Sequence, residues 1–135
     1  MQKVFVDTVA WIALVNSYDS LHSQAKNTLA ELRTDGCRFL TSEFVLVEFA
    51  NTFSSPSFRS SASSFIYGLR NSEETEIVAA SSDLFTAGLA LFKSRADKEW
   101  SLVDCISFVL MNERDITEAF TEDRHFEQAG LARLH

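Results

Sequence analysis

The sequence predicts an α/β fold in which a parallel β-sheet is covered by helices on both faces. Short segments rich in β-favouring residues alternate along the chain with segments of helical spacing, which is typical of a parallel sheet. The run 4–6 is short and entirely apolar, as expected for a strand buried on both faces. Residues 105–111 are apolar nearly all round, as in a helix within a core.

The first predicted strand leads directly into Asp7 and Thr8. In open α/β sheets ligands bind beyond the carboxyl ends of the strands, so Asp7 is a candidate functional residue. The alternative is that Asp7 or Thr8 only caps the helix predicted at 9–15. A single Asp after a single strand leaves both interpretations open, and the other acidic residues bear on the choice.

The remaining elements are predicted from hydrophobic spacing and from start and stop residues. Gly36 ends a helix, because glycine readily adopts the left-handed conformation that follows one. Ser55 and Pro56 form a cap and a first turn, so the serine-rich segment 54–64 is interpreted as the start of a helix, not as a linker. We predict strands at 4–6, 38–41, 75–79, 118–121 and 131–134, and helices at 9–15, 21–34, 43–52, 56–70, 83–95, 101–111 and 122–128.

Capping residues mark the starts of three of these helices. Ser42 is expected to cap the helix at 43–52, and Ser101 with Asp104 fits a capping box. Either Ser82 or Asp83 is expected to cap the helix that reaches residue 95. That helix is predicted to turn four residues inward: Leu84, Gly88, Leu91 and Phe92.

Length and composition limit the class of protein. The 135 residues, of which 46% are hydrophobic, are expected to form one domain, 1–135. No run approaches eighteen apolar residues and no signal-peptide pattern opens the chain, so we expect a cytoplasmic protein without a membrane partner. Cys37 and Cys105 lack metal-ligand spacing and are predicted to be buried thiols.

The net charge of −7 bears on nucleic-acid binding. Non-specific binding to the phosphates of a nucleic acid needs clustered Lys and Arg, and the excess of acidic residues argues against it. It does not exclude an enzyme in which a bound metal ion supplies the local positive charge.

Four acidic residues are predicted to converge at one edge of the sheet: Asp7, Glu48, Asp104 and Asp123. Asp7 follows the first strand, and Glu48 lies in the helix after the second strand. Asp104 opens the core helix, and Asp123 follows the fourth strand. Parallel strands end at the same edge, so these side chains are expected to face a common cleft. Each has a structural alternative. Asp104 fits its capping box, Asp123 fits the first turn of a helix, and Glu48 fits a solvated helix surface.

Such a cluster needs a compensating positive charge. Two unit charges about 4 Å apart repel by about 4 kcal/mol at an effective dielectric constant of about 20. No Lys or Arg is obviously placed to pair with all four acids, so a divalent cation is the simplest compensation. Oxygen ligands favour Mg²⁺ or Mn²⁺ over zinc. His22, His125 and His135 show no ligand spacing and are expected to be surface or packing residues.

A carboxylate-held Mg²⁺ or Mn²⁺ activates water and stabilises phosphate charge, which indicates phosphodiester or phosphomonoester chemistry. Aspartyl phosphatases of the haloacid dehalogenase type need a second Asp two residues after the first, where this chain has Val9. Response-regulator receivers need an Asp at the end of the third strand, where residues 77–81 read Ile-Val-Ala-Ala-Ser. Water-activated phosphodiester cleavage is the chemistry that remains.

With these residues in place, the chain resembles the PIN domains of VapC-type toxin ribonucleases over essentially its whole length. The resemblance rests on Val-Phe-Val-Asp-Thr at 4–8, on the segment 41–51, on Trp-Ser-Leu-Val-Asp-Cys at 100–105 and on Thr-Glu-Asp-Arg-His-Phe at 121–126. It implies a three-layer α/β/α PIN-like fold with a five-stranded parallel sheet, order 3-2-1-4-5. It also implies Mg²⁺- or Mn²⁺-dependent endoribonuclease activity.

The positions that match the family imply a catalytic site made of the four acids, Asp7, Glu48, Asp104 and Asp123. Asp7 and Asp104 are implied as direct metal ligands, with Asp123 and Glu48 completing the site directly or through water. Thr8 and Thr121 are implied to orient the carboxylates. Asn51, which shares a helix face with Glu48, is implied as a supporting residue. No acid of the set is missing, which favours an active enzyme over an inactive scaffold.

The resemblance also implies partners. These are an RNA substrate of the tRNA or rRNA class, a cognate antitoxin whose C-terminal segment blocks the cleft, and a second copy of the chain in a homodimer. The aromatic-rich segment 44–67 is a candidate dimer surface. Two alternatives stay open: a PIN scaffold that binds RNA or protein without turnover, and a PIN nuclease without an antitoxin.

Overall fold

A computed structural model describes residues 2–135 of the chain. The sheet has five strands in the order β3-β2-β1-β4-β5, and every pairing is parallel. The direction and order that the sequence and the resemblance predicted are therefore confirmed. The strands are Lys3–Val6 (β1), Arg38–Ser42 (β2), Thr75–Val78 (β3), Glu118–Phe120 (β4) and Ala132–Leu134 (β5).

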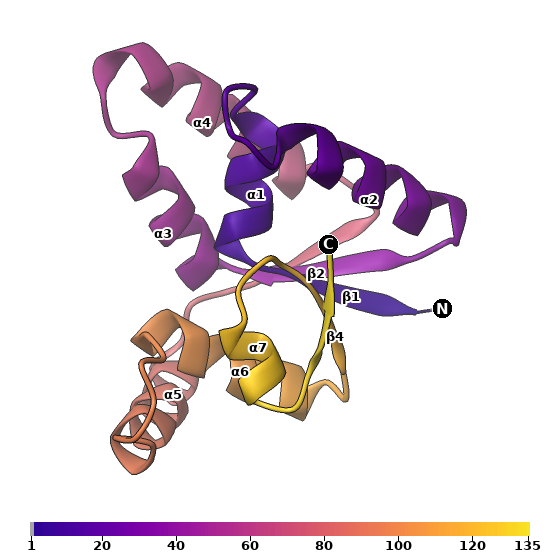
Figure 1. Ribbon diagram of the computed structural model, residues 1–135. Coiled ribbons are helices and arrows are strands. Elements are labelled where there is room, and N and C mark those ends of the chain that lie inside the picture. Colours follow the sequence, from indigo (N-terminus) through magenta and orange to yellow (C-terminus); the bar gives the residue numbers. More distant parts are fainter. Residues whose placement is uncertain (1) are drawn as a thin grey trace.

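The helices cover the sheet on both faces and complete a three-layer arrangement (Figure 1). In this view α1 to α4 lie above the sheet, and α5, α6 and α7 lie below it. The predicted helices are all present, with small shifts at their ends. They are Thr8–Val15 (α1), His22–Thr34 (α2), Glu43–Thr52 (α3), Pro56–Arg70 (α4), Ser82–Ser94 (α5), Leu102–Glu113 (α6) and His125–Gln128 (α7).

The central strand and the core helix are buried as their composition predicts. Val4, Phe5 and Val6 of β1 are at most 1% exposed, because helices cover this strand on both faces. Most of α6 is buried as well. Cys37 and Cys105 are buried free thiols, which confirms their predicted state.

Capping serines fix the starts of α3 and α5. The Ser42 hydroxyl accepts the backbone N–H of Val45 at 3.2 Å, as predicted. The predicted cap of α5, Ser82 or Asp83, was wrong, because Ser81 supplies the acceptor, for the N–H of Leu84 at 3.1 Å.

One predicted core residue of α5 lies on the surface. Leu84 and Gly88 are buried where α5 packs against α6. Phe92, however, is 45% exposed, and together with Phe85 and Leu89 it lines the outer side of the helix. The spacing from Leu84 to Phe92 is consistent with a single helix face when only the sequence is considered. In the structure, the close approach to α6 determines which face of α5 is buried.

That close approach yields a stability prediction. A Cβ at Gly88 would lie 2.3 Å from Cγ1 and 3.0 Å from Cα of Ile106. Gly88→Ala is therefore expected to lower the free energy of unfolding by about 1–3 kcal/mol, because α5 and α6 must separate. Gly68→Ala is the matched control: nothing lies within 4 Å of its added Cβ in α4, and alanine there is expected to stabilise by up to about 1 kcal/mol. Urea unfolding measures both; equal stability of the two variants would contradict the close contact.

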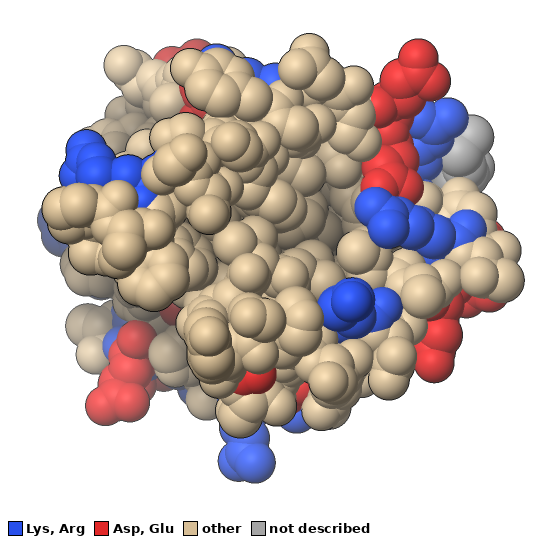
Figure 2. Space-filling model, turned by 90° about the horizontal axis from the view of Figure 1, so that it is seen from above, with Lys and Arg blue, Asp and Glu red and all other residues tan. Residues whose placement is uncertain are grey.

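Two observations describe the surface away from the sheet edge. None of the helices within residues 2–135 combines the length and the apolar content needed to span a bilayer. Figure 2 shows the face above α1 to α4, where Lys and Arg side chains are separated and the centre is mostly uncharged. This face offers no continuous basic surface for nucleic-acid phosphates, in line with the net charge of −7.

Candidate active site

The adjacent ends of β1 and β4 bring Asp7 and Thr121 together. The two strands pair in parallel, with Val6 opposite Phe120, so the residues that follow them are neighbours. The Thr121 hydroxyl donates to Oδ2 of Asp7 at 3.1 Å. Asp7 occupies the N-cap position of α1, but its side chain makes no capping hydrogen bond. Capping therefore does not explain the carboxylate.

Asp104 has the capping role that the sequence suggested, but it uses only one oxygen for it. The backbone N–H of Ser101 donates to Oδ2 of Asp104 at 3.1 Å, and the Ser101 hydroxyl accepts the N–H of Asp104 at 3.0 Å. This capping box fixes the side chain at the first turn of α6. The structural and the functional interpretation of Asp104 are thus compatible.

Asp123 lies in the turn between β4 and α7, not in the first turn of a helix as predicted. The helix begins only at His125, because the carboxylate of Asp123 takes part in the turn that precedes it. The backbone N–H of His125 donates to Oδ1 of Asp123 at 2.9 Å, and the N–H of Asp123 donates to the Thr121 hydroxyl at 2.9 Å. Thr121 therefore connects Asp7 to this turn.

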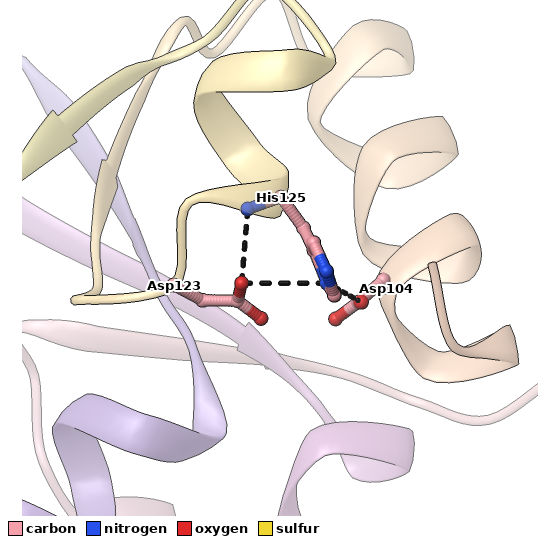
Figure 3. Close-up of side chains that lie close together, drawn as sticks. All are labelled: Asp104, Asp123 and His125. Atoms are coloured by element: carbon pink, nitrogen blue, oxygen red, sulfur yellow. Dashed lines mark hydrogen bonds and ion pairs between the residues drawn. The ribbon is translucent and has the colours of Figure 1, made fainter. Parts of the chain in front are cut away.

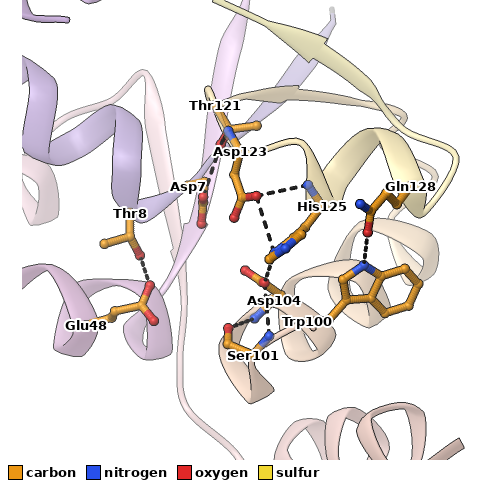
Figure 4. A network of polar contacts seen from close by, with 10 residues as sticks. All are labelled: Asp7, Thr8, Glu48, Trp100, Ser101, Asp104, Thr121, Asp123, His125 and Gln128. Atoms are coloured by element: carbon orange, nitrogen blue, oxygen red, sulfur yellow. Dashed lines mark hydrogen bonds and ion pairs between the residues drawn. The ribbon is translucent and has the colours of Figure 1, made fainter. Parts of the chain in front are cut away.

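Glu48 reaches the site from α3, on the far side of Asp7 from Asp104 (Figure 4). It is half-buried, and its Oε1 accepts the hydroxyl hydrogen of Thr8. Thr8 and Thr121 thus both make hydrogen bonds to acids of the set. Asn51 is exposed one turn further along α3 and lines a cavity of about 200 Å³ between α3 and α4. The supporting role of Asn51 stays a prediction.

Hydrogen bonds orient all four carboxylates. They hold Oδ2 of Asp7, Oε1 of Glu48, Oδ2 of Asp104 and Oδ1 of Asp123, and the backbone of Thr8 also hydrogen-bonds to Asp7. For Glu48, Asp104 and Asp123 the second oxygen accepts no hydrogen bond within residues 2–135. A carboxylate that is oriented by one oxygen and free at the other is suited to bind a cation.

Burial raises the free energy of the ionised carboxylates when no cation is bound. The pKa of Asp7 is raised from 3.8 to about 7, first by burial and then by the charges of Asp104 and Glu48, against the opposing hydrogen bonds of Thr8 and Thr121. The pKa of Asp104 is raised by burial and by Asp123, against the opposing contacts of His125 and Ser101. Ionised together, these groups need a positive charge.

His125 is the site residue that the sequence interpretation missed. It was expected to be a surface or packing residue, but its Nδ1 lies 3.0 Å from Oδ2 of Asp104 and 3.3 Å from Oδ1 of Asp123. One ligand atom from each of these three residues lies within 4.8 Å of the others, as in a group that could hold a metal ion. Asp7 and Glu48 are not members of this group of three, but their charges act on one another and on Asp104. Asp97, by contrast, is paired with Arg95 at 2.9 Å.

The donors fit a divalent cation of the Mg²⁺ or Mn²⁺ class. They are carboxylate oxygens from four separate parts of the chain, and burial has raised the pKa of two of these carboxyl groups, Asp7 and Asp104. The identity of the chain follows from a comparison over nearly its full length: residues 4–131 match the model of the PIN domain family. The chain belongs to the PIN domain family.

Among curated relatives of this PIN domain is VapC20 of Mycobacterium tuberculosis, a 23S rRNA-specific endonuclease. The two sequences are 28% identical over 131 residues, and the alignment covers 97% of each chain. The resemblance to VapC-type proteins that the sequence suggested is thereby confirmed.

Solved structures agree with this assignment. The crystal structure of VapC20, a sarcin–ricin-loop-cleaving toxin, matches with a TM-score of 0.85 and 27% identity over 96% of each chain. VapBC2 of Rickettsia felis, bound to a DNA fragment from its promoter, matches with a TM-score of 0.71 and 16% identity over 98% of this chain and 97% of that one. FitAcB of Neisseria gonorrhoeae matches with a TM-score of 0.64 and 13% identity over 98% of this chain and 96% of that one. The last two share the fold.

Proposed function

We propose that this PIN domain is a Mg²⁺- or Mn²⁺-dependent endoribonuclease and the toxin of a type II toxin–antitoxin pair. The observation that carries the proposal is that four acids from the ends of β1 and β4 and from α3 and α6 face one another, each oriented by hydrogen bonds (Figure 4). The similarity to the endonuclease VapC20 over 97% of the chain supports the choice of RNA as the substrate.

We propose the following roles for the residues of the site. Asp7, Asp104 and Asp123 would hold the cation, and Glu48 would complete the site directly or through water. When bound, the cation supplies an activated water and compensates the charge of the phosphate during in-line displacement. Thr121 holds Asp7 and the turn of Asp123 in place at 3.1 and 2.9 Å.

We propose an RNA substrate of the tRNA or rRNA class, with 23S rRNA as the first one to test because VapC20 acts on it. The charge of −7 implies that RNA is held locally, near the acids, and not over a broad basic surface. Arg124 is exposed and adjoins both Asp123 and His125, which makes it the basic residue nearest to the site in sequence. Unpaired bases in a loop would suit such local recognition.

We also propose the partners that the VapC resemblance implies, namely a cognate antitoxin and a second copy of the chain, with the cytoplasm as the place of action. The antitoxin proposal gains support from the similarity of the fold to VapBC2. Copurification with the product of a neighbouring small gene, followed by loss of cleavage in the complex, tests the antitoxin.

Cleavage of a mixed tRNA and rRNA pool by the purified protein tests the nuclease. We expect discrete fragments with Mn²⁺ that vanish with EDTA. Primer extension of the 23S rRNA then locates the cut. Fragments that persist with EDTA would contradict metal dependence. A rise in melting temperature with Mn²⁺ but no cleavage would indicate a metal site whose RNA substrate lies outside the pool. Neither cleavage nor a response to Mn²⁺ would favour a binding scaffold.

A further inference from the structure

His125 connects two acids that come from different parts of the chain (Figure 3). Asp104 lies at the start of α6, and Asp123 lies in the turn after β4. The imidazole is inserted between them, with its Nδ1 at 3.0 Å from Oδ2 of Asp104 and 3.3 Å from Oδ1 of Asp123. Its side chain is 29% exposed, so one side of the ring is open to solvent.

The chemistry of these contacts fixes which atom donates. An ionised carboxylate oxygen can only accept hydrogen bonds, so Nδ1 of His125 must carry the hydrogen that it donates to Oδ2 of Asp104 at 3.0 Å. Oδ1 of Asp123 lies 3.3 Å from the same nitrogen. The backbone N–H of His125 donates to the same Oδ1 of Asp123 at 2.9 Å. His125 therefore forms one hydrogen bond with each acid, to Asp123 by its backbone and to Asp104 by its side chain, and its ring also lies against Asp123.

The oxygens that His125 contacts are the ones that the protein already holds. Oδ2 of Asp104 also accepts the N–H of Ser101, and Oδ1 of Asp123 belongs to the turn. The opposite oxygens, Oδ1 of Asp104 and Oδ2 of Asp123, accept no hydrogen bond within residues 2–135. Without the imidazole, two carboxylates of like charge would repel each other and turn apart.

We propose that His125 is a positioning residue of the cation site. It holds Asp104 through Nδ1–H and Asp123 through its backbone N–H and the ring contact, so that the free oxygens of both acids face the same cation. This inference rests on the metal site proposed above. Groups that hydrogen-bond to the ligands of a metal typically change its affinity by about 10- to 100-fold when they are removed. The alternative, a direct nitrogen ligand, is an outcome of the test below.

Asn and Leu at position 125 form a matched pair of variants. The two side chains have the same branched shape, but only the Asn amide places an N–H donor where Nδ1 lies. We expect His125→Leu to weaken Mn²⁺ binding about 10- to 100-fold in calorimetric titration. We expect His125→Asn to bind Mn²⁺ within about threefold of the natural chain. Both should melt close to the natural protein when metal is absent.

His22→Leu is the control, because the Nδ1 of His22 contacts the carbonyl oxygen of Ala13 at 2.7 Å and lies outside the acidic cluster. Its Mn²⁺ affinity is expected to be unchanged. Pulsed electron paramagnetic resonance of bound Mn²⁺ distinguishes the two roles of His125. A positioning residue gives no directly coordinated nitrogen signal, whereas a ligand gives one.

The outcomes separate this inference from the proposed function. Absence of Mn²⁺ binding by the natural chain would overturn the metal site itself. Binding by the natural chain and equal binding by His125→Leu would overturn only the positioning role. A coordinated nitrogen signal that disappears in His125→Leu would replace positioning by direct ligation.

Discussion

Asp104→Asn is expected to lower Mn²⁺-dependent cleavage of RNA on the order of 10³-fold or more, because a cation ligand that stabilises charge contributes several kcal/mol to the transition state. The fold should survive. The amide oxygen of Asn can still accept the N–H of Ser101, which Oδ2 of Asp104 accepts at 3.1 Å. The amide nitrogen replaces the free oxygen and points a donor at the cation. Gel-based cleavage rates and the melting temperature without metal measure the two effects.

Asp97→Asn is the matched control for this substitution. Asp97 is exposed and pairs with Arg95 at 2.9 Å, outside the cluster. The Asp97→Asn variant is expected to cleave RNA at the rate of the natural chain. A cleavage rate of Asp104→Asn equal to that of Asp97→Asn would show that Asp104 only caps α6. Loss of folding in Asp104→Asn would point in the same direction.

Most of the fold could be predicted because local patterns and tertiary packing agree. The apolar run at 4–6 allows only a buried strand, and Ser42 supplies the cap that starts α3. The strand order followed from the family resemblance, since no local pattern specifies which strands are neighbours. The errors lie where packing decides. Phe92 is 45% exposed because the contact with α6 at Gly88 selects the buried face of α5.

The candidate site was predictable only in part. The acids could be found because they stand at strand ends and in first turns, where the fold converges. His125 could not, because Asp104 is 21 positions away in the sequence and the two meet only through the packing of α7 against α6. The Asp-x-His turn at residues 123–125 is the one signal that could have indicated it. The division of Glu48, Asp104 and Asp123 into a held and a free oxygen is also a property of the tertiary structure.

The second large effect concerns Asp7 and pH. In the folded chain its pKa is raised to about 7, first by burial, whereas an unfolded chain has the ordinary value of about 3.9. Between these values the folded state keeps a proton that the unfolded state has lost. The stability of the metal-free protein therefore falls as pH rises from about 4 to about 7. The expected loss of stability is on the order of a few kcal/mol.

Asp7→Asn removes this dependence, because the amide never ionises and can still accept the hydroxyl hydrogen of Thr121. Without metal, the variant is expected to be more stable than the natural chain at pH 8 by a few kcal/mol, and close to it at pH 4. Urea unfolding across this range measures the difference, with Asp97→Asn as the exposed control.

Because protons and cations compete for Asp7, Mn²⁺ should stabilise the natural chain more at pH 8 than at pH 5 and should hardly stabilise Asp7→Asn. If the free energy of unfolding changed with pH in the same way for Asp7→Asn and the natural chain, Asp7 would not be a buried carboxyl that keeps its proton up to about pH 7.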